Sequence, residues 1–252
     1  MTASRKPIRL LVFDIDGVLN RSESKAFDLP LLERLAEINH TARADPSCPA
    51  VTLCTGRPAA YVEAVLRAIN GHLPAVYENG AALYLPDGYR FLPHPALENQ
   101  PSFEAVRQRL EDELVHTGQA VLQPGKDYSL SYVASAPSET DLLYKQAVAA
   151  LGPLNESVDL VCSASCLNVL PRGIHKGKGV EFLASQTDYD PGEMLGVGDS
   201  DVDLPFLARV GHSAAPANAN PDVKRLVQYV APHPAADGVR DILDYFGLTS
   251  RR

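Results

Sequence analysis

A run of four apolar residues, Leu10 to Phe13, ends directly in acid and constrains this chain more than any other segment. A short continuous apolar run fits a strand covered on both faces, as in a parallel sheet. Asp14 and Asp16 follow two residues apart, so in an extended chain their carboxylates lean to the same side, and Gly17 lets the backbone turn away. Open α/β sheets bind ligands at such strand ends, and two adjacent carboxylates repel each other unless a cation or a shared proton relieves them. Taken alone, the segment also fits a strand and an Asp-Gly turn with solvated acids.

Composition and charge exclude several classes of function. The 252 residues allow one large domain or two smaller ones. The 23 basic and 31 acidic residues give a net charge of −8, and the scattered basic residues form no stripe that would bind nucleic acid. No apolar run approaches the roughly 20 residues of a membrane span, and the N-terminal MTASRKPIRLL leads into the first strand without a signal-peptide core. We therefore expect a cytoplasmic protein with no nucleic-acid or membrane partner; nothing in the sequence indicates its oligomeric state. Its cysteines, which lack the spacing of a metal site and are expected to be reduced thiols, are Cys48, Cys54, Cys162 and Cys166.

Three more apolar runs predict further strands, at residues 50–54, 75–77 and 194–197, and helical patterns at residues 29–38 and 59–69 separate the first three strands. The second strand leads into Thr55, Gly56 and Arg57. Proline is favoured in the first turn of a helix, so Pro58 places these residues at a helix start, where unpaired N–H groups attract anions. By itself this segment also fits an ordinary Thr cap.

An insert of mixed character follows the third strand and its ENGA loop at residues 78–81. Between about residues 83 and 166, alternating segments that contain aromatic residues are interleaved with helical patterns at 103–115 and 139–151, which predicts an α+β unit. Residues 167–184 then predict a strand, a turn and a helix with Lys176 near its start. The chain closes with a strand, a helix, a short strand and a last helix at residues 238–246.

The strand at residues 194–197 also ends in acid, with Asp199, Asp201 and Asp203. If a helix begins near Asp201, Asp199 caps it and Asp203 lies in its first turn, which lets their two carboxylates approach one point. We interpret Asp201 as an acid favoured only by the helix dipole. Together with Asp14 and Asp16, the other two acids supply the oxygen ligands that a hard divalent cation such as Mg2+ requires.

These motifs occur together in the order of a known superfamily. An aspartate pair after a first strand, a Thr after the second, a Lys at the start of a later helix and a GDxxxD pattern resemble the haloacid dehalogenase-like phosphotransferases over nearly the whole chain. The ENGA loop, an insert between it and the lysine, and a tail that reads PANANPDVK and DGVRDIL resemble the subgroup with a C2-type cap. That subgroup includes sugar phosphatases, sucrose phosphate phosphatase, mannosyl-3-phosphoglycerate phosphatase, archaeal phosphoglycolate phosphatase and eukaryotic phosphomannomutase.

The resemblance implies an α/β fold of two parts. A doubly wound, mostly parallel, Rossmann-like catalytic core would comprise residues 1–82 and 168–252. An inserted α+β C2-type cap of residues 83–167 would select the substrate.

The resemblance also implies the catalytic roles. Asp14 would be the nucleophile that takes the phosphoryl group, and Asp16 the acid that protonates the leaving oxygen and later activates water, as a phosphoaspartate mechanism requires. Mg2+ would lie among the Asp14 carboxylate, the Asp16 backbone carbonyl and Asp199, with Asp203 bound to the metal or supporting its ligands.

The phosphate group would be held by Thr55, by the N–H of Gly56 and by Lys176, the lysine of the family's KG dipeptide. Arg57 and Asn79 would face the same crevice and contact the substrate beyond its phosphate. Two neighbours of Lys176 are interpreted as surface residues: His175 and Lys178.

One position departs from the pattern of the subgroup. The residue before the last acid is usually Asn, which is implied to help bind phosphate, and here it is Val202. A valine donates no hydrogen bond. The nucleophile, the acid and the metal ligands remain, so the leading hypothesis is a Mg2+-dependent phosphatase that acts on a small phosphorylated sugar or organic acid.

Two alternatives stay open. A phosphomutase of the phosphomannomutase type would need a second anion site in the cap, for which we expect the two arginines of one helix, Arg107 and Arg109, to be the best candidates. A binding or regulatory protein that keeps the fold with weak catalysis is the other alternative, and Val202 is its one indication. The remaining basic residues of the insert that we considered for a second anion site are Arg90, Lys126 and Lys145.

Overall fold

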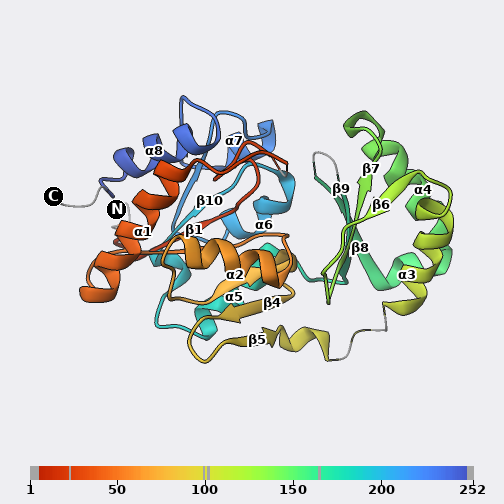
Figure 1. The fold of residues 1–252 in the computed structure, drawn as a ribbon, viewed down its shortest axis with the longest axis horizontal. Coiled ribbons are helices and arrows are strands. Elements are labelled where there is room, and N and C mark those ends of the chain that lie inside the picture. The colour runs from red at the N-terminus through yellow and green to blue at the C-terminus, as the bar shows by residue number, and fades with distance from the viewer. Residues whose placement is uncertain (1–5, 23, 99, 101–102, 164–165, 249–252) are drawn as a thin grey trace, which may run out of the picture.

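A parallel sheet of five strands forms the centre of the larger part of the molecule (Figure 1). The computed structural model describes residues 6–22, 24–98, 100, 103–163 and 166–248, so the N-terminal residues 1–5 of the predicted lead into the first strand lie outside it. The order of the strands is β12-β11-β10-β1-β2, and each neighbouring pair is parallel. The strands are β1 (Leu10–Phe13), β2 (Ala50–Leu53), β10 (Met194–Val197), β11 (His212–Ala215) and β12 (Tyr229–Val230).

Helices cover both faces of this sheet. Leu11 and Phe13 point to one face, where they pack with side chains of α1, α2 and α8, while Leu10 and Val12 pack on the other face with α5, α6 and α7. This is why the run reads as continuously apolar: alternate side chains enter two different cores. The helices are α1 (Leu29–Ala44), α2 (Ala59–Ala68), α5 (Lys176–Ser185), α6 (Leu204–Leu207), α7 (Pro221–Leu226) and α8 (Ala235–Tyr245).

A three-stranded antiparallel sheet extends the core beyond β2. It consists of β3 (Ala75–Tyr77), β4 (Ala82–Leu85) and β5 (Arg90–Pro93). One isolated parallel bridge, between Cys54 and Val76, joins β3 to the end of β2. Leu83 of β4 is buried in the same hydrophobic cluster as Leu10, so this hairpin packs on the five-stranded parallel sheet.

A second unit has its own sheet and its own hydrophobic core (Figure 1). We call its four-stranded antiparallel sheet, in the order β6-β7-β9-β8, the cap sheet. Helices α3 and α4 pack on the face of the cap sheet that lies away from the core, through residues such as Leu110 and Leu143. These elements are β6 (Ala120–Leu122), β7 (Leu130–Ala134), β8 (Val158–Cys162), β9 (Cys166–Pro171), α3 (Glu104–Leu110) and α4 (Thr140–Leu151).

The predicted fold class, a doubly wound α/β core with an α+β insert, is confirmed. The predicted division at residues 82/83 and 167/168 stays a prediction. Two details bear on it: residue 83 lies inside β4, which packs on the core, and residue 168 lies inside β9, which belongs to the cap sheet.

Several element boundaries differ from the sequence prediction. Helix α1 continues to Ala44 instead of residue 38, because Asn39 and Ala42 extend its buried face while the other residues after 38 are exposed. The predicted helix at 103–115 is α3 followed by a π-helical turn, Glu111–Val115. Helix α8 begins at Ala235. The sequence prediction missed β8, because it is an edge strand whose side chains are mostly half-exposed and show no alternation.

The structure also bears on membrane-spanning helices and on the cysteines. Among the described residues, no helix is long and apolar enough to cross a bilayer. None of the four cysteines forms a disulfide in the part of the chain that the structure describes, and two of them, Cys54 and Cys166, are buried.

Candidate active site

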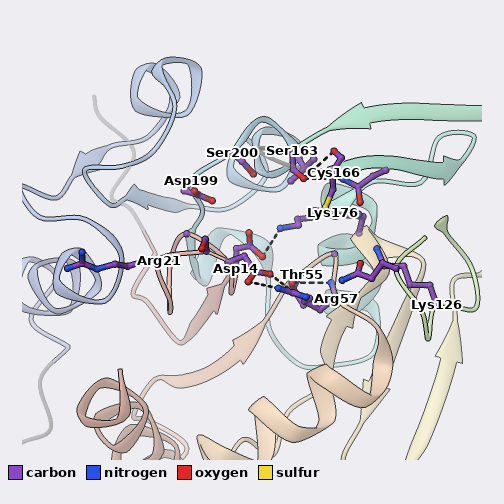
Figure 2. A pocket seen from close by; sticks show the side chains of 18 residues that line it. Asp14, Arg21, Thr55, Arg57, Lys126, Ser163, Cys166, Lys176, Asp199 and Ser200 are labelled. Atoms are coloured by element: carbon purple, nitrogen blue, oxygen red, sulfur yellow. Dashed lines mark hydrogen bonds and ion pairs between the residues drawn. The ribbon is translucent and has the colours of Figure 1, made fainter. Parts of the chain in front are cut away.

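The carboxyl ends of β1, β2 and β10 lie side by side and open into one pocket (Figure 2). Its cavity has a volume of about 130 Å³. The core supplies the floor, with residues that follow these three strands. The second unit supplies part of the wall, through residues such as Lys126, between β6 and β7, and Asn168 of β9. The pocket therefore lies at the sheet edge where the sequence predicted ligand binding.

A buried lysine joins two of the predicted acids. The ammonium of Lys176 lies 2.8 Å from Asp14 Oδ1 and 2.6 Å from Asp203 Oδ1. The three side chains are almost fully buried, with 1% of Lys176 exposed. Burial opposes the charge of the lysine, but the carboxylates of Asp14 and Asp203 raise its pKa, so that it stays protonated.

Asp203 also organises the loop after β10. Its Oδ2 accepts hydrogen bonds from the N–H groups of Asp199 and Ser200, at 2.9 and 3.0 Å, and from the Ser200 hydroxyl at 3.2 Å. Ser200, and not Asp199 as the sequence predicted, is the N-cap of the 3-10 turn Asp201–Asp203 that precedes α6. Asp199 is thereby free of the capping role, and its carboxylate points into the pocket (Figure 2).

The acids that follow β1 and β10 come together in a group that can hold a metal ion. One carboxylate oxygen from each of Asp14, Asp199 and Asp203 lies within 4.8 Å of the others. Burial, with repulsion from Asp203 and Asp14, raises the pKa of Asp199 to about 8. Burial also raises the pKa of Asp14 to about 7, although the charge of Lys176 lowers it. Carboxylate oxygens that repel one another in a buried site fit a hard divalent cation. Its positive charge would offset both their mutual repulsion and the cost of burying them.

Gly17 is needed where the two acidic loops meet. Its φ of +81° is unfavourable for residues with a side chain, and a Cβ there would lie 2.0 Å from Asp199 Oδ2. The glycine that the sequence placed after the acids therefore turns the chain and also leaves room for Asp199.

The carboxylate of Asp16 is held from a different side. Arg57 donates to it through Nε at 2.6 Å and through Nη2 at 2.9 Å, and Asn20 donates through Nδ2 at 3.2 Å. The guanidinium of Arg57 also lies over the ring of Tyr61, 4.7 Å from its centroid. Arg57 was predicted to contact substrate. It does line the pocket, but it forms a bidentate ion pair with Asp16.

The predicted phosphate ligands Thr55 and Gly56 line the same pocket. Thr55 is buried, and its hydroxyl accepts a hydrogen bond from the N–H of Arg57 at 3.3 Å. A Cβ on Gly56 would lie 3.0 Å from the amide of Asn79, so the glycine admits that side chain into the pocket wall. Asn79 has a φ of +57°, in the left-handed region that Asn tolerates better than most residues.

The neighbours of Lys176 lie outside the pocket, as predicted. His175 is the N-cap of α5, because its Nδ1 accepts from the N–H of Lys178 at 3.3 Å. The ammonium of Lys178 pairs with Glu181 at the surface. Val202, in contrast, is half-buried in the pocket wall.

Sequence reasoning assigned no role to several other residues of the pocket. They come from the cap sheet, its connections and the loop after β1, and they belong to none of the motifs found in the sequence. They are Arg21, Ser22, Gln123, Ser163, Cys166 and Asn168. The two arginines named as candidates for the second anion site of a phosphomutase lie on α3, where Arg107 pairs with Glu111 and Arg109 with Glu113. Lys126, named only among the basic residues of the insert, is the one of that set that lines the pocket.

The fold and the site define a doubly wound α/β enzyme with a buried Asp–Lys–Asp group beneath a capped pocket. A sequence profile of the haloacid dehalogenase-like hydrolase family matches residues 146–243. The matched segment covers less than half of the chain, and it agrees with the resemblance to the haloacid dehalogenase-like hydrolases that the sequence motifs carry.

Proteins that are similar to this chain agree with the same resemblance. A phosphoglycolate phosphatase of Methanothrix thermoacetophila is 34% identical over 95 residues, which cover 38% of this chain and 43% of that protein. A phosphoglycolate phosphatase of Methanopyrus kandleri is 25% identical over 237 residues, 93% of this chain and 95% of that protein. The crystal structure of a Thermoplasma acidophilum protein has the same fold, with a TM-score of 0.73 and 20% identity over 97% of this chain and 100% of that one.

Proposed function

We propose that this hydrolase is a Mg2+-dependent phosphatase that cleaves a small phosphomonoester through a phosphoaspartate on Asp14. The observation that carries the proposal is the pairing of Asp14 with buried Lys176, 2.8 Å away, at the floor of a pocket that Thr55 and Gly56 also line. Aspartate is a nucleophile that can accept a phosphoryl group, and it splits one difficult displacement into two easier ones. Relatives named phosphoglycolate phosphatase support a small phosphorylated acid as the substrate.

Different residues of the pocket bind phosphate, transfer protons and position the catalytic acid in this reaction. Lys176, Thr55 and the N–H of Gly56 bind the phosphate oxygens and orient the phosphorus atom towards Asp14. Asp16 gives a proton to the leaving oxygen and then takes one from the attacking water. Arg57 holds both oxygens of Asp16 and so fixes the direction in which that carboxylate points.

The metal ligands of this proposal are Asp14, the backbone carbonyl of Asp16, and Asp199, while Asp203 holds Lys176 and the loop that carries Asp199. Bound Mg2+ would supply the positive charge that lets an anionic carboxylate and an anionic phosphate approach each other. A cytoplasmic location remains an expectation from the sequence and is part of the proposal.

A phosphate-release assay on a panel of monophosphates tests the proposal. We expect release that stops with a chelator, returns with Mg2+ and returns poorly with Ca2+, whose larger and looser coordination misplaces the attacking and leaving groups. Absence of release on every monophosphate, or release indifferent to chelator, would contradict it. Transfer of phosphate between two positions of a bisphosphate would indicate the phosphomutase alternative, and binding without turnover would indicate the regulatory one.

A further inference from the structure

Lys126 is a buried cation that the reaction described above does not use. It lies between β6 and β7, lines the pocket and is 8% exposed. Figure 2 shows it on the cap side of the pocket, beyond Thr55 and Arg57 as seen from Asp14. Its ammonium donates to Ser131 Oγ at 2.5 Å and, within the described part of the chain, forms no ion pair. Burying an ammonium without a carboxylate partner costs free energy of folding. A binding partner that is present only in the complex with substrate would account for such a residue.

The hydrogen bonds around Lys126 make this wall of the pocket a set of donors. Because the hydroxyl of Ser131 accepts from Lys126, its single proton goes to Asn168, at 2.6 Å, and the atom of Asn168 that receives it must be the carbonyl oxygen. The amide NH2 of Asn168 therefore points away from Ser131, and its nitrogen lies 3.5 Å from Ser163 Oγ. The wall thus presents an ammonium and an amide donor in a fixed arrangement.

The catalytic core holds the loop of Lys126 in place. The buried carboxylate of Glu78, directly after β3, accepts hydrogen bonds from the N–H groups of Asp127, Tyr128 and Ser129, at 2.8 to 2.9 Å, and from the Ser129 hydroxyl at 2.8 Å. Four donors on one carboxylate fix the loop firmly. Burial lowers the pKa of Lys126, which the charge of Glu78 partly offsets, to about 8, so that the lysine remains mostly protonated at neutral pH.

We infer that Lys126, with Asn168, binds a second anionic group of the substrate, a carboxylate, while the phosphate lies at Asp14. This inference rests on the proposed phosphatase function and narrows its substrate class to short phosphorylated carboxylic acids. One ammonium and one neutral amide match the single charge of a carboxylate better than the double charge of a second phosphate. The cavity of about 130 Å³ leaves room for only a short organic part, since pockets for drug-sized ligands begin at roughly 300 Å³.

The test compares two substrates of similar length, 2-phosphoglycolate and 2-hydroxyethyl phosphate, in which a hydroxymethyl group replaces the carboxylate. We expect the wild-type protein to prefer the acid in kcat/KM, and Lys126→Met to lower the ratio of the two kcat/KM values by about tenfold to a hundredfold, the range of a lost hydrogen bond to a charged group. Lys145→Met is the matched control, because Lys145 is an exposed lysine of the cap helix α4, and it should leave the ratio unchanged.

Each outcome has a distinct meaning. Equal use of both substrates by the wild-type protein, or an equal loss on both in Lys126→Met, would overturn the carboxylate assignment while phosphatase activity itself persists. A preference for ethylene glycol bisphosphate over the acid would also overturn it, in favour of a second phosphate. Release from none of these substrates would instead count against the proposed function. Turnover of 2-hydroxyethyl phosphate by the variant shows that its active site is folded.

Discussion

Proton release on metal binding offers a measurement that depends on the geometry of the acids and needs no substrate. Burial raises the pKa of Asp199 to about 8 and that of Asp14 to about 7. Both carboxyls must be ionised to bind Mg2+, so protons and metal compete for the same oxygens. The affinity for Mg2+ should therefore rise with pH between 6 and 8 and change little above that range.

The size of the effect follows from these values. A carboxyl with a pKa of about 8 is ionised in about one molecule in a hundred at pH 6 and in about half at pH 8, which alone gives a rise of about fiftyfold. Asp14 adds up to about tenfold more by the same reasoning. We expect a total rise on the order of a hundredfold or more, with about two protons released per Mg2+ at pH 6 and fewer than one at pH 8.

The same groups predict how stability varies with pH. A carboxyl whose pKa is raised on folding stabilises the metal-free protein fully below its unfolded value of about 4, and this contribution is lost as pH rises through the folded values of about 7 and 8. Mg2+ takes the place of the lost protons. The increase in Tm on adding Mg2+ should therefore be larger at pH 8 than at pH 6.

Calorimetric titration with Mg2+, in buffers that differ in ionisation enthalpy, measures both the affinity and the number of protons released. Asp201→Asn is the control variant, because Asp201 is an exposed acid of the same loop that binds Asn220, and it should keep the pH dependence. An affinity that changes less than about threefold between pH 6 and 8 would refute the argument that these two carboxyls hold protons in the metal-free site.

Three substitutions test the roles of single residues. Asp14→Asn is isosteric and removes the charge of the attacking oxygen, so it should eliminate turnover while the circular dichroism spectrum is kept; turnover within a few-fold of wild type would contradict the nucleophile assignment. Arg57→Lys cannot hold both oxygens of Asp16, so kcat should fall at least about tenfold with little change in KM, whereas a rise in KM alone would favour the predicted substrate contact. Val202→Asn should raise kcat/KM by roughly tenfold on a preferred monophosphate, from one added hydrogen bond to phosphate, and a loss on every substrate would show that the valine itself contributes to specificity.

The sequence by itself determined the parallel core and the floor of the pocket. Each strand is a short local run, and the acids, the Thr-Gly pair and the lysine follow directly at strand ends or helix starts, so chain order and the rules of parallel sheets bring them to one edge. The grouping of Asp14 and Asp203 around Lys176 is the structural counterpart of that prediction. Details that depend on hydrogen-bond partners could not be predicted from the sequence. The N-cap is Ser200 and not Asp199, because the carboxylate of Asp203 accepts a hydrogen bond from the N–H of Ser200.

Only the tertiary structure decided which residues of the insert face the catalytic acids. Lys126 and Arg107 are both cations of the insert, but Lys126 reaches the pocket while Arg107 pairs with Glu111 on the far side of the cap sheet. The difference arises because Glu78, 49 residues from Asp127 in the sequence, binds the loop beside Lys126 to the core. No local pattern encodes such a contact, since its energy comes from groups that meet only after both units have folded and the cap has packed against the core.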